Sequence, residues 1–90
     1  MKITKRNGSI TVYDDEKVKN SILKANARIE GETISDNMAE AMANEVFDRL
    51  TQDDVNLSTA DVRACVYGLL KERDFPLTAE EYWTYKKDKN

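Results

Sequence analysis

The amino-terminal quarter of the chain decides its fold, and it is Ile3-Thr4-Lys5-Arg6-Asn7-Gly8-Ser9-Ile10-Thr11-Val12-Tyr13-Asp14-Asp15-Glu16-Lys17. Two short runs of β-prone residues flank Asn7-Gly8, a pair that readily adopts the positive φ angles of a tight turn. The second run continues directly into a pattern typical of a helix. The stretch therefore predicts a β-hairpin over residues 2–13, followed at once by the first helix.

Ile10 and Val12 alternate with polar Ser9 and Thr11 in the second run. Such alternation is expected when one face of a strand is covered. Because a two-stranded hairpin is rarely stable alone, we expect another part of the chain to pack against that face.

Four helices are predicted from the spacing of apolar residues and from start and stop signals. Asp14 is expected to cap the first, and Ser58 to cap the third through a reciprocal capping box with Asp61. Thr78 opens a similar capping pattern for the last helix, and Pro76 disfavours helical geometry at the residue before it. The predicted helices span residues 15–29, 36–51, 59–73 and 79–88.

The expected fold class is α+β and mainly helical. Residues 1–90 should form a single domain, in which an N-terminal β-hairpin provides a small lid sheet packed on a four-helix bundle. The chain shows no internal repeat and no linker.

The composition excludes several kinds of protein. The chain has no histidine and a single cysteine, Cys65, which rules out structural zinc and both Cys/His and Ser/His/Asp catalysis. Cys65 falls among apolar positions of a helical repeat, so we interpret it as a small buried hydrophobe. No apolar run is long enough to cross a membrane and the amino terminus lacks the apolar core of a secretion signal, so we expect a cytoplasmic protein.

Charge is distributed unevenly along the chain. The whole chain carries a net charge of -3, but its first 24 residues carry six cationic and three acidic side chains, a net +3, which leaves -6 for the rest. A locally cationic end on an acidic protein suits a compact anion better than a long polyanion. We therefore expect a compact anionic ligand, and the charge disfavours a nucleic-acid partner, with a nucleic-acid-binding module left open as a second alternative.

Lys5, Arg6 and Lys17 are the cations that can meet where the hairpin joins the first helix. A helix start favours anions through its free amides and its dipole, so a phosphate chain could bind there. Lysines at a strand edge also guard against aggregation, and this alternative stays open. A second question stays open too, because Lys5 and Arg6 are neighbours on a strand and point to opposite faces.

Two further clusters have a structural interpretation. The acidic group of residues 14–16 could bind Mg²⁺, but helix capping explains it with fewer assumptions, and we predict no metal site. The aromatic residues Tyr82, Trp83 and Tyr85 could stack on a base, but aromatic residues at helical spacing in a small domain more often belong to the core. No P-loop and no GxGxxG motif is present, and no cluster pairs a nucleophile with a base.

Three segments, in order along the chain, resemble a known family. The first is Lys5-Arg6-Asn7-Gly8 with Tyr13-Asp14, Lys17-Val18 and Ser21-Ile22-Leu23-Lys24-Ala25, the second covers residues 59–66, and the third is Ala79-Glu80-Glu81-Tyr82-Trp83-Thr84-Tyr85-Lys86. They resemble the ATP-cone, the regulatory nucleotide-binding domain at the amino terminus of ribonucleotide reductases, whose closing pattern is Ala-x-x-Tyr-x-x-Tyr-Arg. The resemblance spans essentially the whole chain.

The resemblance implies an allosteric regulator, not an enzyme, that binds ATP or dATP with Mg²⁺ under a hairpin or three-stranded lid. The nucleotide would control association with the catalytic or radical-generating subunit of ribonucleotide reductase, or the formation of a homo-oligomer. By motif position, Lys5, Arg6 and Lys17 would hold the triphosphate. The other implied nucleotide-binding residues are Ile3, Asp14, Thr59, Arg63, and Lys86 or Lys87 in place of the family's arginine.

The chain departs from the longer members of the family in two ways. It ends just past the closing motif, so we expect an excised domain or a stand-alone cone. No cysteine-rich zinc ribbon precedes the motif, which disfavours the reductase-gene repressor that also carries this domain. If the cations are only surface charge, the alternative is a small helical protein-interaction module without nucleotide binding.

Overall fold

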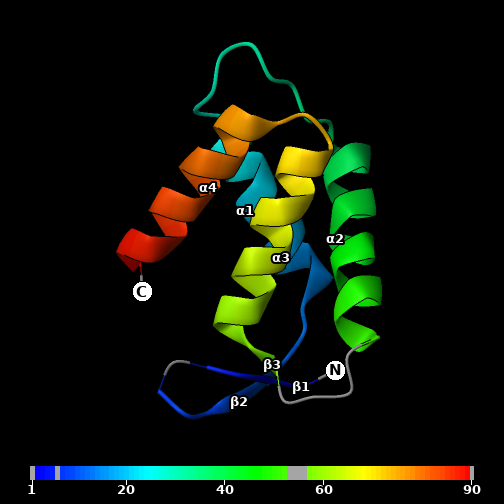
Figure 1. The fold of residues 1–90 in the computed structure, drawn as a ribbon, viewed down its shortest axis with the longest axis vertical. Coiled ribbons are helices and arrows are strands. Elements are labelled where there is room, and N and C mark those ends of the chain that lie inside the picture. Colours follow the sequence, from blue (N-terminus) through cyan, green and yellow to red (C-terminus); the bar gives the residue numbers. More distant parts are fainter. Residues whose placement is uncertain (1, 6, 53–56, 90) are drawn as a thin grey trace.

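The computed structural model describes residues 2–5, 7–52 and 57–89, with side chains as far as Tyr85. Four helices form an antiparallel bundle, and a small sheet covers one end of it (Figure 1). The helices are α1 (Asp15–Asn26), α2 (Asp36–Thr51), α3 (Thr59–Glu72) and α4 (Pro76–Lys89). The mainly helical α+β fold expected from the sequence is confirmed.

The sheet has three strands, β1 (Lys2–Thr4), β2 (Ile10–Val12) and β3 (Leu57–Ser58), in the order β2-β1-β3. β1 and β2 form the antiparallel hairpin, with a turn in which Gly8 adopts a φ of 89°, a conformation that residues with a side chain rarely adopt. β1 also pairs in parallel with β3, placing Ile3 opposite Leu57. The pattern of residues did not predict β3, which makes β1 the central strand.

The covered face of the hairpin is not the one expected from Ile10 and Val12, and that expectation is wrong. Both side chains are 66% exposed, whereas Ile3 is 3% exposed and packs in the core with Leu57. The register explains the difference. It pairs Ile3 with Thr11 on the face toward the helices and leaves the two apolar residues of β2 largely open to solvent.

Helix bounds differ from the prediction mainly at the start of α4. The helix begins at Pro76 instead of residue 79. The first position of a helix needs no N–H donor, and the fixed φ of proline suits it, so proline is favoured there. Thr78, expected to cap this helix, is instead fully buried within it. α1 ends at Asn26 and α3 at Glu72, earlier than the predicted residues 29 and 73.

The cap of α4 comes from the loop between α1 and α2. The Glu32 carboxylate accepts hydrogen bonds from the backbone N–H of Leu77 at 3.0 Å and of Thr78 at 2.8 Å, and from the Thr78 hydroxyl at 2.8 Å. The Asn26 side chain donates to the Glu32 carbonyl and to the Thr78 hydroxyl, and accepts from the N–H of Ile34. We call these bonds the Asn26 network, and they lie at the end of the bundle opposite the sheet (Figure 1).

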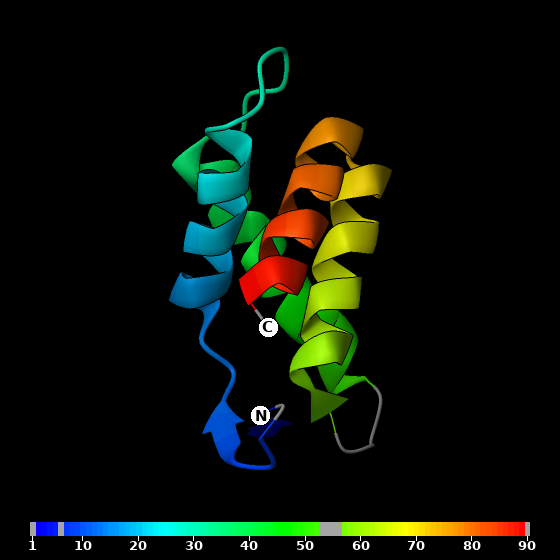
Figure 2. The ribbon, with the colours of Figure 1, turned by 90° about the vertical axis from the view of Figure 1, so that its left-hand side faces the viewer.

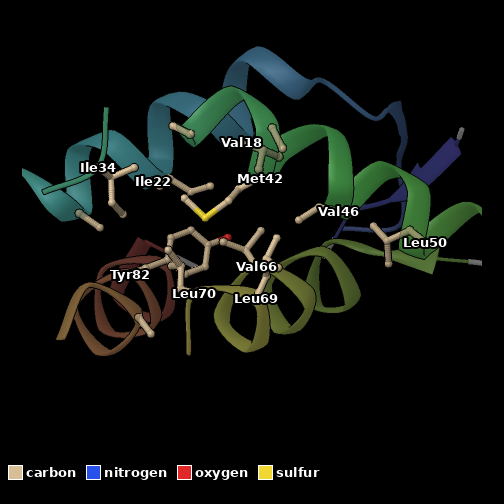
Figure 3. Close-up of a cluster of buried hydrophobic side chains, with 14 of the residues drawn as sticks. Val18, Ile22, Ile34, Met42, Val46, Leu50, Val66, Leu69, Leu70 and Tyr82 are labelled. Atoms are coloured by element: carbon tan, nitrogen blue, oxygen red, sulfur yellow. The ribbon is translucent and has the colours of Figure 1, made fainter. Parts of the chain in front are cut away.

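The core fills the space between all four helices. Figure 3 shows Ile22 of α1 and Met42 of α2 facing Val66, Leu70 and Tyr82 of α3 and α4. All of these side chains are at most 3% exposed. The apolar spacing of the helices therefore predicts most of the core, but Met38 and Phe47, which share the apolar spacing of α2, are 41% and 40% exposed.

Cys65 lies half-buried on α3 and packs against this core. Burial raises the pKa of its thiol, which is the behaviour of a packing residue and not of a reactive thiolate. Within the described part of the chain, no helix is both long and apolar enough to cross a membrane.

Candidate functional site

A cavity of about 270 Å³ lies between the sheet and the adjacent end of the bundle. α1 and α3 both begin next to the sheet, and the end of α4 lies between them (Figure 2). Residues of β1, β2, α1, α3 and α4 line the cavity. Because helix starts carry partial positive charge, the starts of α1 and α3 favour an anionic ligand, whereas the end of α4 carries the opposite partial charge.

The predicted site residues meet in this cavity. All six whose side chains the structure describes line it, and they are Ile3, Lys5, Asp14, Lys17, Thr59 and Arg63. Arg6 and the side chains of Lys86 and Lys87 lie outside the described residues. Residues from three separate segments of the sequence thus line one cavity, and that they bind a nucleotide stays a prediction.

The cations of the cavity stand on two sides. Lys5, directly after β1, and Lys17, in the first turn of α1, are both exposed. Arg63 comes from α3 and is half-buried. Its Nε is buried and has no hydrogen-bond partner among the residues that the structure describes. A buried donor without an acceptor costs free energy.

Asp14 caps α1, as predicted. Its Oδ1 accepts hydrogen bonds from the N–H of Glu16 at 3.1 Å and of Lys17 at 3.4 Å. Because these two amides are occupied, an anion at this helix start would be met by the Lys17 side chain instead. Among the described residues, no group of three or more His, Cys, Asp or Glu side chains is arranged to hold a metal ion.

A capping box places Thr59 at the cavity. Ser58 Oγ accepts from the N–H of Asp61 at 3.3 Å, and the Asp61 carboxylate accepts from the N–H of Ser58 at 2.7 Å, which confirms the predicted pair. β3 ends at Ser58, so Thr59 is the first residue of α3 and is held between the sheet and the helix. Thr59 therefore lines the cavity from the start of α3.

That apolar part was not identified from the sequence. Val18 of α1, Val62 of α3 and Tyr82 of α4 line the cavity, and Val18 and Tyr82 also belong to the core. Helical spacing predicted their burial, and Tyr82, interpreted as a core residue, is 3% exposed. Spacing alone does not distinguish a core residue from a residue that lines a cavity. However, Val62 lies one helical turn from the predicted site residue Thr59, and this proximity could have identified it as a lining residue.

Two tyrosines connect the cavity to the bundle. Tyr13 donates a hydrogen bond from its hydroxyl to the Ala43 carbonyl at 2.7 Å, and its ring lies 5.6 Å from that of Phe47. Burial raises the pKa of Tyr13 above its ordinary range. Burial also raises the pKa of Tyr82, although the positive charge of Arg63 opposes that shift. Both phenols therefore stay protonated at neutral pH.

Comparison with known protein families matches residues 1–90 to the ATP cone domain. No match is found among curated proteins. The family match covers the whole chain and agrees with the motif resemblance. Domains of this family bind ATP or dATP and have a regulatory role, not a catalytic one. The chain therefore belongs to the ATP-cone family of allosteric nucleotide-binding regulatory domains.

Proposed function

We propose that this domain binds ATP or dATP, with Mg²⁺ on the phosphates, in the cavity between the sheet and the helix starts, and that the bound nucleotide controls ribonucleotide reductase. One observation carries the proposal. It is the convergence of Ile3, Lys5, Asp14, Lys17, Thr59 and Arg63 on one cavity of a chain that belongs to a nucleotide-binding family.

The chemistry of the cavity suits the two halves of a nucleotide. Its volume of about 270 Å³ is just below the range of about 300 to 1,000 Å³ for small-molecule sites, so the cavity can enclose only part of a nucleotide. The apolar walls from Val18 and Val62 would take the adenine, and the exposed Lys5 and Lys17 would hold the phosphates outside it. Thr59 offers a hydroxyl to the edge of the base, and Asp14 has a second carboxylate oxygen for the base or sugar.

Titration calorimetry of the 90-residue chain with ATP and with dATP, each with and without Mg²⁺, tests this binding directly. We expect saturable binding of both nucleotides, strengthened by Mg²⁺. Circular dichroism of the same sample checks that it is folded. If a folded sample binds neither nucleotide at millimolar concentration, the proposed site is wrong and the protein-interaction module becomes the better interpretation.

Regulation would act through association with a partner. A nucleotide in the cavity would contact β1, α1, α3 and α4 together, and so would favour the arrangement of these elements in which all its contacts form. The catalytic or radical-generating subunit of the reductase, or a second copy of this chain, would then bind with an affinity that depends on the nucleotide.

Size-exclusion chromatography of the chain with each reductase subunit, in ATP, in dATP and without nucleotide, tests this second step. We expect the elution volume of the mixture to differ between ATP and dATP. The same elution in all three conditions would contradict the reductase partner and leave nucleotide binding standing.

A further inference from the structure

Arg63 is held differently from the other arginines that the structure describes. Arg28, Arg49 and Arg73 each form an ion pair with a glutamate. Arg63 forms none with the described residues, and its buried Nε has no hydrogen-bond partner there. Among the residues that the structure describes, no carboxylate therefore neutralises its positive charge.

An aromatic ring takes the place of that carboxylate. The Cζ atom of Arg63 lies 4.5 Å from the centroid of the Trp83 ring, which is cation–π distance. The other neighbours of Trp83 hold the ring in place, since its centroid is 5.0 Å from that of Tyr67 and the Tyr67 hydroxyl donates to the Glu80 carboxylate. Lys71 donates to the same hydroxyl at 3.1 Å.

We propose that Trp83 positions Arg63 for contact with the nucleotide, an inference that rests on the proposed function. A carboxylate would hold the guanidinium by using its N–H groups and cancelling its charge, whereas a ring face holds it from one side and leaves the N–H groups free. Arg63 lines the cavity on the α3 wall, while Lys5 and Lys17 line it near β1 and α1. Trp83 thus keeps a third cation ready for an anionic ligand without occupying its donors.

A double-mutant cycle measures this coupling. ATP affinity is compared by calorimetry in the wild type, Arg63→Met, Trp83→Leu and the double variant. We expect Trp83→Leu to weaken ATP binding by about three- to tenfold, the scale of a lost cation–π contact, and Arg63→Met to weaken it at least as much because it removes the cation itself. Trp83→Leu should then add nothing in the Arg63→Met background, and Trp83→Phe, which keeps a ring face, should restore most of the affinity. Additive losses, or an unchanged affinity in Trp83→Leu, would overturn the positioning role.

The chain offers a matched control in Tyr85 on the same helix. Its ring holds the Arg28 guanidinium at 5.3 Å from the centroid, and neither residue lines the cavity. Tyr85→Leu should therefore leave ATP affinity unchanged. An equal loss in Tyr85→Leu would show that any aromatic residue removed from α4 weakens binding through the fold, which contradicts a specific role for Trp83.

Fluorescence tests the wild-type chain without relying on the folding of a variant. Trp83 is the single tryptophan of the sequence, so its emission reports the Arg63 contact. Saturating ATP should shift this emission in the wild type and leave it unchanged in Arg63→Met at a concentration where that variant is also saturated. ATP binding with no shift in the wild type would overturn the inference alone, whereas absence of ATP binding would overturn the proposed function and the inference together.

Discussion

The two ends of the helical bundle differ in whether their polar side chains are hydrogen-bonded to one another. At the end away from the sheet, Asn26, Glu32 and Thr78 satisfy one another and the start of α4 through the Asn26 network. At the sheet end, exposed Lys5 and Lys17 line a cavity together with Arg63, whose Nε has no hydrogen-bond partner in the described part of the chain. Both ends contain helix starts that side chains cap, which at the sheet end are Asp14 and Ser58, but the sheet end in addition presents cations to a cavity.

This difference separates stability from binding. A buried polar group contributes to stability when its hydrogen bonds are made, and costs free energy when they are not. The end with the Asn26 network should therefore contribute more to the free energy of unfolding. The end with the cavity should contribute more to the affinity for the nucleotide. Substitutions at one end should leave the property of the other end nearly unchanged.

The largest effect is expected from Asn26→Ala. The change removes three hydrogen bonds and leaves buried groups of Thr78, Glu32 and Ile34 without that partner. We expect the free energy of unfolding to fall by about 3 kcal/mol, measured by urea denaturation. Asn20→Ala, at an exposed position of the same helix, is the control and should cost little. If Asn26→Ala and Asn20→Ala lowered the free energy of unfolding equally, the Asn26 network would not be a main source of stability.

Lys5→Ala and Lys17→Ala test the cavity end. Each should weaken ATP binding by about 1 to 3 kcal/mol, the scale of a hydrogen bond to a charged group, without lowering the free energy of unfolding. Lys24→Ala is the matched control, because Lys24 is exposed in the last turn of α1, away from the cavity. If ATP affinity is unaltered in the double lysine variant, the phosphate site is misplaced even though the family is right.

A smaller and pH-dependent effect is expected from Glu32→Gln. Burial works to raise the pKa of Glu32, but the hydrogen bonds from the backbone N–H groups of Thr78 and Leu77 and from the Thr78 hydroxyl outweigh it and lower the pKa below its ordinary value of 4.5. A carboxyl with a lowered folded-state pKa stabilises the fold above its unfolded pKa, and that contribution is lost as pH falls through the folded pKa.

Wild type should therefore exceed Glu32→Gln in unfolding free energy by about 1 kcal/mol at pH 7, the scale of a helix cap. Urea denaturation across the acid range should show this difference shrinking as the pH falls below the ordinary carboxyl value. Glu30→Gln, in the same loop at an exposed position, provides the comparison. A difference between wild type and Glu32→Gln that is as large at pH 3 as at pH 7 would show that the carboxylate charge is not what caps α4.

The smallest effect concerns Asp74, which follows α3 with a φ of 72°. A residue with a side chain is strained in this left-handed region, and glycine is not. Asp74→Gly should raise the free energy of unfolding by about 0.5 kcal/mol, because the relief of strain exceeds the greater freedom of glycine in the unfolded chain. Asp74→Ala keeps the strain and should not stabilise the domain. Thermal unfolding of Asp74→Gly and Asp74→Ala therefore separates the effect of backbone strain from that of the lost side chain.

The sequence predicted well those features that depend on residues close together in the chain, such as helix caps. Asp14 and Ser58 cap their helices because each partner lies within three residues. Apolar spacing predicted most of the core, since it decides which residues share a helix face, but it also included Met38 and Phe47, which are exposed. The mainly helical fold and the position of the hairpin followed from these local patterns.

The errors concern partners that are distant in the sequence. Thr78 has the local pattern of a cap, but Glu32, in a loop two helices earlier, already caps α4, so Thr78 is buried instead. Ile10 and Val12 alternate correctly, yet alternation does not say which face is covered, and the register with Ile3 exposed them. The pairing of β3 is likewise non-local, and a strand of two residues has no periodicity to detect.

The parallel pairing of β1 with β3 has a consequence for the order of folding. β1 lies between a partner just across the turn and a partner that comes after both α1 and α2 in the sequence. Bringing such distant segments together costs chain entropy that the helix contacts must first offset, so the sheet should close after α1 and α2 have packed. The cavity exists only once β1, α1 and α3 are all in place. A nucleotide bound there would select chains that have completed folding and would slow their unfolding from the sheet end.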